Sequence, residues 1–263
     1  MTATVKKLHP GNAPDGMTAE EWQTRCDLAA AYRLAARYGW TDLAGTHFSA
    51  RIPGPEDHFL LNPFGMLFDQ ITASSLIKVD CDGNMIGKSD YPFNPAGFVI
   101  HSAIHMNRPE LTAVLHTHTR AGAGVSSQKH GLLPINQKQL TLMGFLGYHD
   151  YEGAALNEDE RTRIVRDLGD DGRCMILRNH GLMTVGESIA EAWVWMYRLE
   201  AACQFQIDAQ AAGGEFYELS EETKQYTIDQ GKKLFKPGGI APCGFEWPSL
   251  LKQLDDSGEV YRV

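Results

Sequence analysis

The chain has 263 residues, enough for one large domain with a full hydrophobic core. Its content of 43% hydrophobic and 22% charged residues is typical of a soluble globular protein. The formal net charge of −9 at pH 7 argues against nucleic acid or an anionic membrane as partner and leaves a small-molecule substrate open.

The five cysteines and the chain start indicate a cytoplasmic protein. The cysteines are scattered, odd in number and form no C-x-x-C pair, which favours reduced thiols. The first residues lack a long apolar run, so we expect no secretory signal peptide. No apolar run approaches the roughly 18 residues of a membrane-spanning helix.

The first third of the chain predicts one helix followed by short strands. Residues 1–17 are polar and are expected to form an N-terminal arm. Thr18 with Glu21 is a capping box that starts a helix, and Gly39 ends it. We expect strands over 47–52 and 58–61, a helical turn within 71–76 and a hairpin over 77–86 around Asp82-Gly83.

Helices and short strands alternate in the rest of the chain. This mix predicts a mixed or mainly antiparallel sheet with helices on both faces, in a single domain over 18–235. An irregular Pro/Gly-rich tail is expected over 236–263. The expected helices cover 95–107, 119–129, 138–146, 157–168, 188–212 and 221–234, and the expected strands cover 111–115, 147–151, 174–178 and 182–185.

Three histidines follow two of the predicted strands. His116 and His118 end the first of them, and residues two apart on a strand point to the same face. His180 follows the apolar run 174–177, a strand that could lie close by. Three imidazoles can hold a metal ion. The alternative interpretation is three partly buried histidines whose rings bond to the backbone.

His101 and His105 lie one turn apart on the helix predicted over 95–107. This spacing can bind a metal, but the Glu of an H-E-x-x-H motif is absent. We interpret the pair as supporting the metal ligands or facing the substrate. A simple packed or solvated pair is the alternative.

An ordered series of motifs runs through the chain, namely Gly45-Thr46-His47-Phe48-Ser49-Ala50-Arg51, Asn62-Pro63-Phe64-Gly65, Arg108-Pro109-Glu110, His116-Thr117-His118 and Arg178-Asn179-His180-Gly181. Together these motifs resemble the class II aldolase/adducin family over about residues 25–215. The resemblance implies an α/β/α sandwich around a mainly antiparallel central sheet, and a homotetramer with active sites near subunit interfaces. It also implies a divalent metal, zinc first with iron or manganese as alternatives, held by His116, His118 and His180.

The departures from the family pattern concern the substrate. Sugar-phosphate aldolases of the family carry a Glu base where this chain has Gly97, and two phosphate-binding serines where it has Pro95 and Ala96. Phe64 replaces a phosphate-binding hydroxyl residue, and His47 replaces an Asn but could still donate one bond. Most of these changes remove donors that a phosphate dianion needs, so we expect a non-phosphorylated substrate.

The resemblance then predicts a metal-dependent carbon–carbon lyase that acts by retro-aldol cleavage or decarboxylation on a hydroxy or oxo compound. Phe64, Phe98 and Tyr148 suggest a more apolar or aromatic substrate, although each such residue is more often part of the core. His101, His105, Tyr148 and Asp150 are the candidates for the missing base. A non-haem Fe(II) oxygenase with the same three histidines is an alternative. A non-catalytic adducin-like module is the third hypothesis, although such members generally lack the full histidine set.

Overall fold

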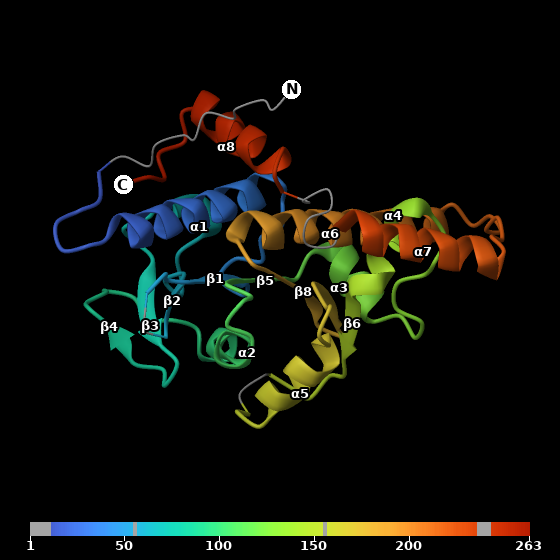
Figure 1. Cartoon of the computed structure of the whole chain (residues 1–263), viewed down its shortest axis with the longest axis horizontal. Coiled ribbons are helices and arrows are strands. Elements are labelled where there is room, and N and C mark those ends of the chain that lie inside the picture. Colours follow the sequence, from blue (N-terminus) through green and yellow to red (C-terminus); the bar gives the residue numbers. More distant parts are fainter. Residues whose placement is uncertain (1–11, 55–56, 155–156, 236–242) are drawn as a thin grey trace.

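The computed structural model describes residues 12–54, 57–154, 157–235 and 243–263. One eight-stranded sheet, in the order β4-β3-β2-β1-β5-β8-β7-β6, lies between two layers of helices (Figure 1). All neighbouring strands are antiparallel except the pair β6 and β7. The strands are β1 (His47–Arg51), β2 (His58–Leu61), β3 (Ile77–Asp80), β4 (Met85–Ile86), β5 (Ala113–Thr117), β6 (Leu146–His149), β7 (Cys174–Leu177) and β8 (Gly181–Gly186).

The two helical layers differ in thickness. Helices α2 and α5 pack together and cover one face of the sheet, whereas α1, α3, α4 and α6 cover the other, with α7 and α8 outside them (Figure 1). The α-helices are α1 (Ala19–Arg37), α2 (Pro95–Asn107), α3 (Arg120–Ser126), α4 (Gln137–Leu142), α5 (Glu160–Leu168), α6 (Ile189–Ala211), α7 (Glu221–Phe235) and α8 (Glu246–Asp256), with short 3₁₀ turns η1 (Phe68–Gln70) and η2 (Met143–Phe145).

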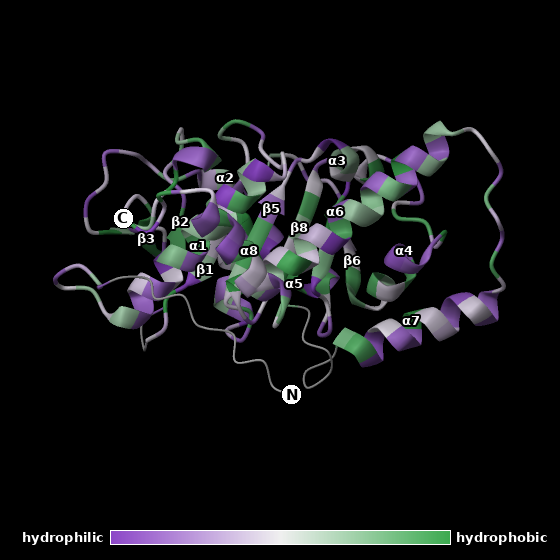
Figure 2. Ribbon diagram, turned by 90° about the horizontal axis from the view of Figure 1, so that it is seen from above, coloured by the Kyte–Doolittle hydropathy of each residue, from purple (hydrophilic) through white to green (hydrophobic). Residues whose placement is uncertain are grey.

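The strand periodicity explains why both faces of the sheet are covered. Along β5, Leu115 belongs to the core cluster under α1 and α6, whereas Val114 belongs to the cluster under α2 and α5. Every residue of β5 is buried. The central strands are accordingly apolar, while the outlying α7 is largely polar (Figure 2). The predicted sandwich around a mainly antiparallel sheet is therefore confirmed.

The helix starts show which local signals were read correctly. The hydroxyl oxygens of Thr18 and Ser188 accept hydrogen bonds from the N–H groups of Glu21 and Glu191, which are the N-cap bonds that start these two helices. The helix expected over 157–168 starts later than predicted. The Asn157 side chain accepts from the N–H of Asp159 in a preceding turn, and α5 begins only at Glu160.

The expectation of an irregular C-terminal tail is wrong for the residues that the structure describes there. Helix α8 packs on α1 and buries Trp247 and Leu254. Pro248 falls in its first turn, where a missing N–H costs no helical hydrogen bond. Beyond α8, Tyr261 is buried and its carbonyl accepts from the N–H of Ala73 at 2.8 Å. The domain boundaries at 18 and 235 stay predictions, and residues 1–11 and 236–242 lie outside the described residues.

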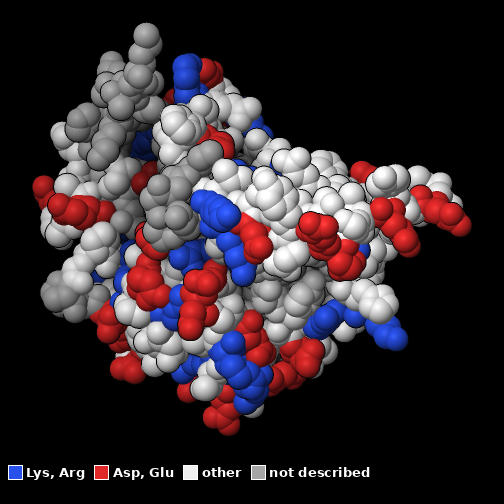
Figure 3. All heavy atoms as spheres, turned by 45° about the vertical axis from the view of Figure 1, so that its right-hand side comes forward, with Lys and Arg blue, Asp and Glu red and all other residues white. Residues whose placement is uncertain are grey.

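The surface carries both signs of charge. On the face shown in Figure 3, Lys and Arg are interspersed with Asp and Glu over the body, while the projecting end carries mainly acidic side chains. Within the described residues, no helix combines the length and the apolar composition that crossing a membrane requires.

Candidate metal centre

The end of β5 carries two histidines on the face of the sheet that α2 and α5 cover. His116 lies opposite His47 of β1 and opposite Met183 of β8. Val114 packs under α2 and α5, and alternate residues of a strand share a face. His116, and His118 just beyond the strand, therefore follow Val114 on that face.

The turn between β7 and β8 brings His180 to the same place. Asn179 has a positive φ of 56°, a conformation that Asn tolerates better than most residues, and its N–H donates to the carbonyl of Ser126 at 3.0 Å. Gly181 lets the turn approach β5, because a Cβ there would collide with the carbonyl oxygen of Thr117. The Asn-His-Gly sequence thus fixes the position of the imidazole.

The three imidazoles converge. One ring nitrogen from each of His116, His118 and His180 lies within 4.8 Å of the other two. His116 Nδ1 lies 2.9 Å from the carbonyl oxygen of Leu182, which requires a hydrogen on Nδ1 and leaves the Nε2 lone pair free. His118 Nδ1 lies 2.9 Å from Asp42 Oδ2 in the same way. Metal-binding histidines are typically oriented by such partners, so this donor set fits a divalent metal.

The charge state of the cluster also suits a metal. Burial, followed by the neighbouring histidines, holds the pKa of His116 well below its ordinary value of 6.5. Burial and His118 lower the pKa of His180 to about 4. Both rings are therefore neutral at pH 7, and only a neutral imidazole has a lone pair for a metal ion.

A second group of histidines lies beside the first and is fully buried. His101 and His105 of α2 alternate with His47 and Ser49 of β1, so that the side chains form one chain of hydrogen bonds. His47 Nδ1 lies 2.8 Å from His101 Nε2, His101 Nδ1 contacts Ser49 Oγ, and Ser49 Oγ lies 2.7 Å from His105 Nε2. We call these four residues the β1–α2 histidine chain.

The β1–α2 histidine chain reaches the metal cluster through His47. The rings of His47 and His116 have their centroids 4.9 Å apart. The ring of His47 also lies against Gly97 of α2, where an added Cβ would be 2.7–2.9 Å from its ring atoms. A side chain at position 97 and the present position of His47 therefore exclude each other. The two departures at 47 and 97 are physically coupled.

The structure sorts the predicted catalytic and substrate residues. His101 and His105 are brought close to the cluster, but they are buried and face His47 and Ser49 instead of open space. Asp150 and His180 line one small hollow. Tyr148 packs on the opposite face of the sheet, where its hydroxyl accepts from the N–H of Leu132.

Phe64 lies on the exposed turn after β2, where its N–H donates to the carbonyl of Pro92. Its role in substrate binding stays a prediction, as do the roles assigned to the other site residues.

Two residues of the site were missed by the sequence interpretation. Ser49 lies two residues after His47, so both side chains point to the same face of a strand. His101 and His105, four residues apart, point to the same face of a helix, and the sequence could therefore have suggested that these two faces pack together. Asp42, which orients His118, gave no local signal, because its loop reaches β5 only through the tertiary fold.

The sequence model of the Class II Aldolase and Adducin N-terminal domain matches residues 26–207. The chain belongs to the class II aldolase and adducin family. This confirms the resemblance inferred from the motifs.

The relatives of the chain include proteins named as aldolases and proteins named as adducins. The chain is 50% identical to an aldolase II superfamily protein from Pseudomonas syringae, with a TM-score of 0.88 over 95% of this chain and 98% of that one. It is 32% identical to an L-fuculose 1-phosphate aldolase from Glaciozyma antarctica, with a TM-score of 0.78 over 96% and 97%. It is 45% identical to alpha-adducin from Rattus norvegicus in a match that spans 100% of this chain and 40% of alpha-adducin.

Proposed function

We propose that the protein is a metal-dependent carbon–carbon lyase that performs retro-aldol cleavage or decarboxylation on a non-phosphorylated hydroxy or oxo compound, with an aromatic one as the first choice to test. The convergence of His116, His118 and His180, with Leu182 and Asp42 orienting two of the rings, is the observation that carries the proposal. Zinc is the expected metal, with iron or manganese as the alternatives.

We propose a separate role for each group of residues in the site. His116, His118 and His180 would hold the divalent metal, which when bound would supply a positive charge to offset negative charge developing on the substrate oxygens. Asp42 and the carbonyl of Leu182 hold two of the rings in one tautomer. We assign contact with the substrate to His47, and its position next to His116 and over Gly97 supports this assignment.

The β1–α2 histidine chain supports a donor role for His47. Among the described residues, Nδ1 of His105 has no hydrogen-bond partner. A buried N–H without an acceptor is rarer than an acceptor without a donor, which favours a bare Nδ1 and a hydrogen on Nε2. We infer that His105 donates to Ser49, Ser49 to His101, and His101 to His47 Nδ1. The remaining nitrogen of His47, Nε2, then carries a hydrogen that can bond to a substrate oxygen.

A phosphorylated sugar fits this site poorly, although one relative is named as an L-fuculose 1-phosphate aldolase. Positions 95 and 96 are Pro and Ala, which offer no hydroxyl, and position 64 is Phe. A phosphate dianion needs several donors, and the inferred hydrogen of His47 would provide only one.

A non-catalytic module is the second candidate function, and the 45% identity to alpha-adducin favours it. The intact histidine cluster argues for catalysis, since adducin-like members generally lack the full set. The five free cysteines agree with the cytoplasmic location that we propose. A homotetramer with sites near the subunit interfaces remains our proposal for the assembly.

Product analysis separates the candidates. The purified chain is incubated with a panel of 2-oxo acids and hydroxy acids, aromatic members included, with and without dioxygen. We expect cleavage or decarboxylation products without dioxygen, and their loss in His116→Ala. Products that require dioxygen would instead indicate an iron oxygenase. No turnover of any compound, together with an unchanged biological role of His116→Ala, would support the non-catalytic module.

A further inference from the structure

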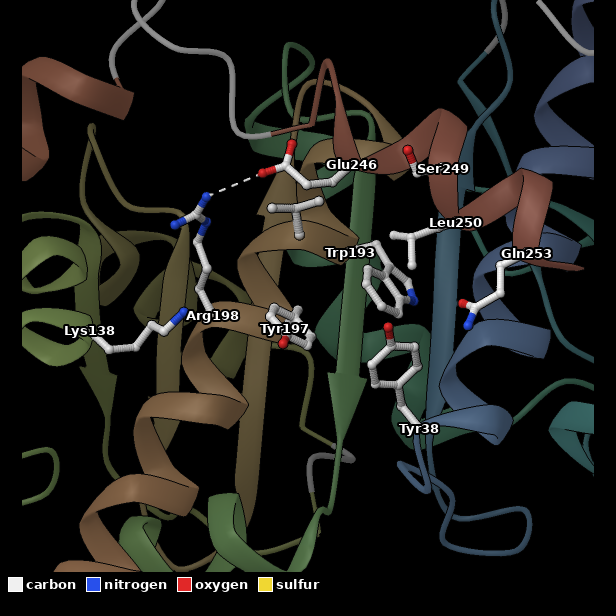
Figure 4. Close-up of a pocket in the computed structure, with 10 residues that line it drawn as sticks. Tyr38, Lys138, Trp193, Tyr197, Arg198, Glu246, Ser249, Leu250 and Gln253 are labelled. Carbon is white, nitrogen blue, oxygen red and sulfur yellow. Dashed lines mark ion pairs between the residues drawn. The ribbon is translucent and has the colours of Figure 1, made fainter.

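A second hollow lies on the side of the sheet away from the histidines. Its volume is about 530 Å³, and it opens between α4, α6 and α8 (Figure 4). Small-molecule sites typically enclose about 300–1,000 Å³. Its lining combines aromatic rings at one end with two cationic side chains at the other (Figure 4). The hollow is thus large enough for a small organic molecule and is chemically polarised.

Three aromatic side chains form one wall. The rings of Trp193 and Tyr197, one turn apart on α6, are nearly parallel at 13° with centroids 6.2 Å apart. Tyr38 meets Trp193 edge-on at 5.2 Å. The indole Nε1 of Trp193 is buried and has no hydrogen-bond partner among the described residues. Trp193 is almost fully buried, whereas Tyr38 and Tyr197 are 39% and 41% exposed, so a flat ring that enters the hollow packs against the two tyrosines.

The cationic end carries more positive than negative charge. Lys138 Nζ lies 5.8 Å from the centroid of the Tyr197 ring, and no ion pair with a described carboxylate is formed. Arg198 pairs with Glu246 at 3.6 Å and stacks over Phe235. Burial and the charge of Arg198 both lower the pKa of Lys138. The hollow is therefore lined by two cations and one carboxylate, which pairs with Arg198 alone, and a bound anion would offset the repulsion between Lys138 and Arg198.

We propose that this pocket binds a small molecule that joins a flat apolar ring to one anionic group, either a carboxylate or a phosphate. The ring lies against Tyr38, Tyr197 and Leu250, and the anion lies at the end where Lys138 and Arg198 project (Figure 4). The site is independent of the proposed lyase reaction, because it lies on the other side of the sheet and shares no residue with the metal cluster.

Calorimetric titration of the full chain tests the pocket. The probes are indole-3-acetate and phenyl phosphate, with indole-3-acetamide and acetate as the ligands that lack the charge or the ring. We expect at least one ring-bearing anion to bind, the amide to bind about tenfold more weakly or worse, and acetate not to bind. Phenylacetate, as a further probe, carries the same ring as phenyl phosphate, so the tighter of these two anions identifies the anionic group.

Variants locate the binding. Lys138→Gln is expected to weaken the anion about tenfold, whereas the exposed Lys129→Gln and the metal-site variant His116→Ala should bind like the parent. Unchanged thermal unfolding of Lys138→Gln confirms that the fold is intact. No saturation by any of the ring-bearing anions at 10 mM, about the weakest affinity worth calling a site, would overturn the proposal. Equal binding by Lys138→Gln would also overturn it, as would sedimentation showing that Lys138→Glu splits an oligomer while no probe binds.

Discussion

Two groups of histidines lie side by side on one face of the sheet, and they differ in what their ring nitrogens contact. In the metal cluster, the outer nitrogens of His116 and His118 bond to an oxygen acceptor, and the inner ones converge. In the β1–α2 histidine chain, the nitrogens of His47, His101 and His105 face each other and Ser49. The metal cluster therefore has free lone pairs that can bind a metal ion, whereas the hydrogen bonds of the β1–α2 histidine chain hold the ring of His47 in place.

The difference teaches that residue type and spacing do not decide the role of a histidine. His101 and His105 have a spacing that suits a metal, but β1 supplies a hydroxyl and a third imidazole that bond to both ring nitrogens of His101 and to Nε2 of His105. His116 and His118 have a weaker signal, but a carbonyl and a carboxylate behind the rings leave the front nitrogens free. The partners contributed by other elements decide the chemistry.

The largest expected effect is that of acidification on stability, through the buried β1–α2 histidine chain. Burial lowers the pKa of His105 to about 3, below the value near 6.5 that it takes in the unfolded chain. Between these values the unfolded state binds a proton that the folded state does not. The free energy of unfolding therefore falls as the pH drops from about 6.5 toward 3, by about 1.4 kcal/mol per pH unit for this residue.

Urea unfolding of the metal-free protein between pH 7 and pH 5 measures that slope. His105→Gln should remove the contribution of one histidine, and the flattening of the slope should approach about 1.4 kcal/mol per pH unit only at the acidic end of this range, where the unfolded histidine is fully protonated. An identical slope in parent and variant would show that His105 is not held neutral by burial.

Position 97 tests whether His47 and Gly97 are coupled. In Gly97→Ala the new Cβ would lie 2.7 Å from the ring of His47, so the ring must move. We expect a loss of about 1–3 kcal/mol in unfolding free energy, despite the better helix propensity of Ala. Gly124→Ala in α3 is the matched control, because its Cβ meets Ile207 at an ordinary 3.4 Å. Equal stability of the two variants would contradict the coupling.

The carboxylate behind His118 should have a smaller and more local effect. Asp42→Ala removes the acceptor that orients the ring, and such changes typically weaken metal binding by about 10–100-fold. Competition with a chelator measures the zinc affinity, and the exposed Asp90→Ala serves as control. If Asp42→Ala binds zinc as tightly as the control, Asp42 does not orient the ligand.

Much of the fold could be predicted, because periodicity and capping are local. The alternation along β5 placed His116 and His118 on one face, and the capping residues Thr18 and Ser188 marked two helix starts correctly. Helix α8 was missed because Pro248 and the surrounding glycines read as a loop, although Trp247 and Leu254 bury a helical face.

The site could be predicted only in part, because its ordering depends on tertiary packing. Tyr148 lies on the face of the sheet away from the metal cluster. Its neighbour His149 points to the opposite face, and the sequence alone did not reveal which of the two alternating sets of β6 residues faces the cluster. The roles of Ser49 and Asp42 depend on contacts between distant segments: β1 packs against α2, and the loop that carries Asp42 packs against the end of β5. The role of Gly97 likewise depends on where the ring of His47 lies.

The central claim is that His116, His118 and His180 hold a divalent metal. Elemental analysis of protein purified without air and without added metal tests it most directly, with His116→Ala beside the parent. We predict close to one zinc per chain in the parent and a small fraction of that in the variant. Manganese would keep the lyase proposal, and iron would favour the oxygenase. No metal in either protein, or equal metal in both, would contradict the account.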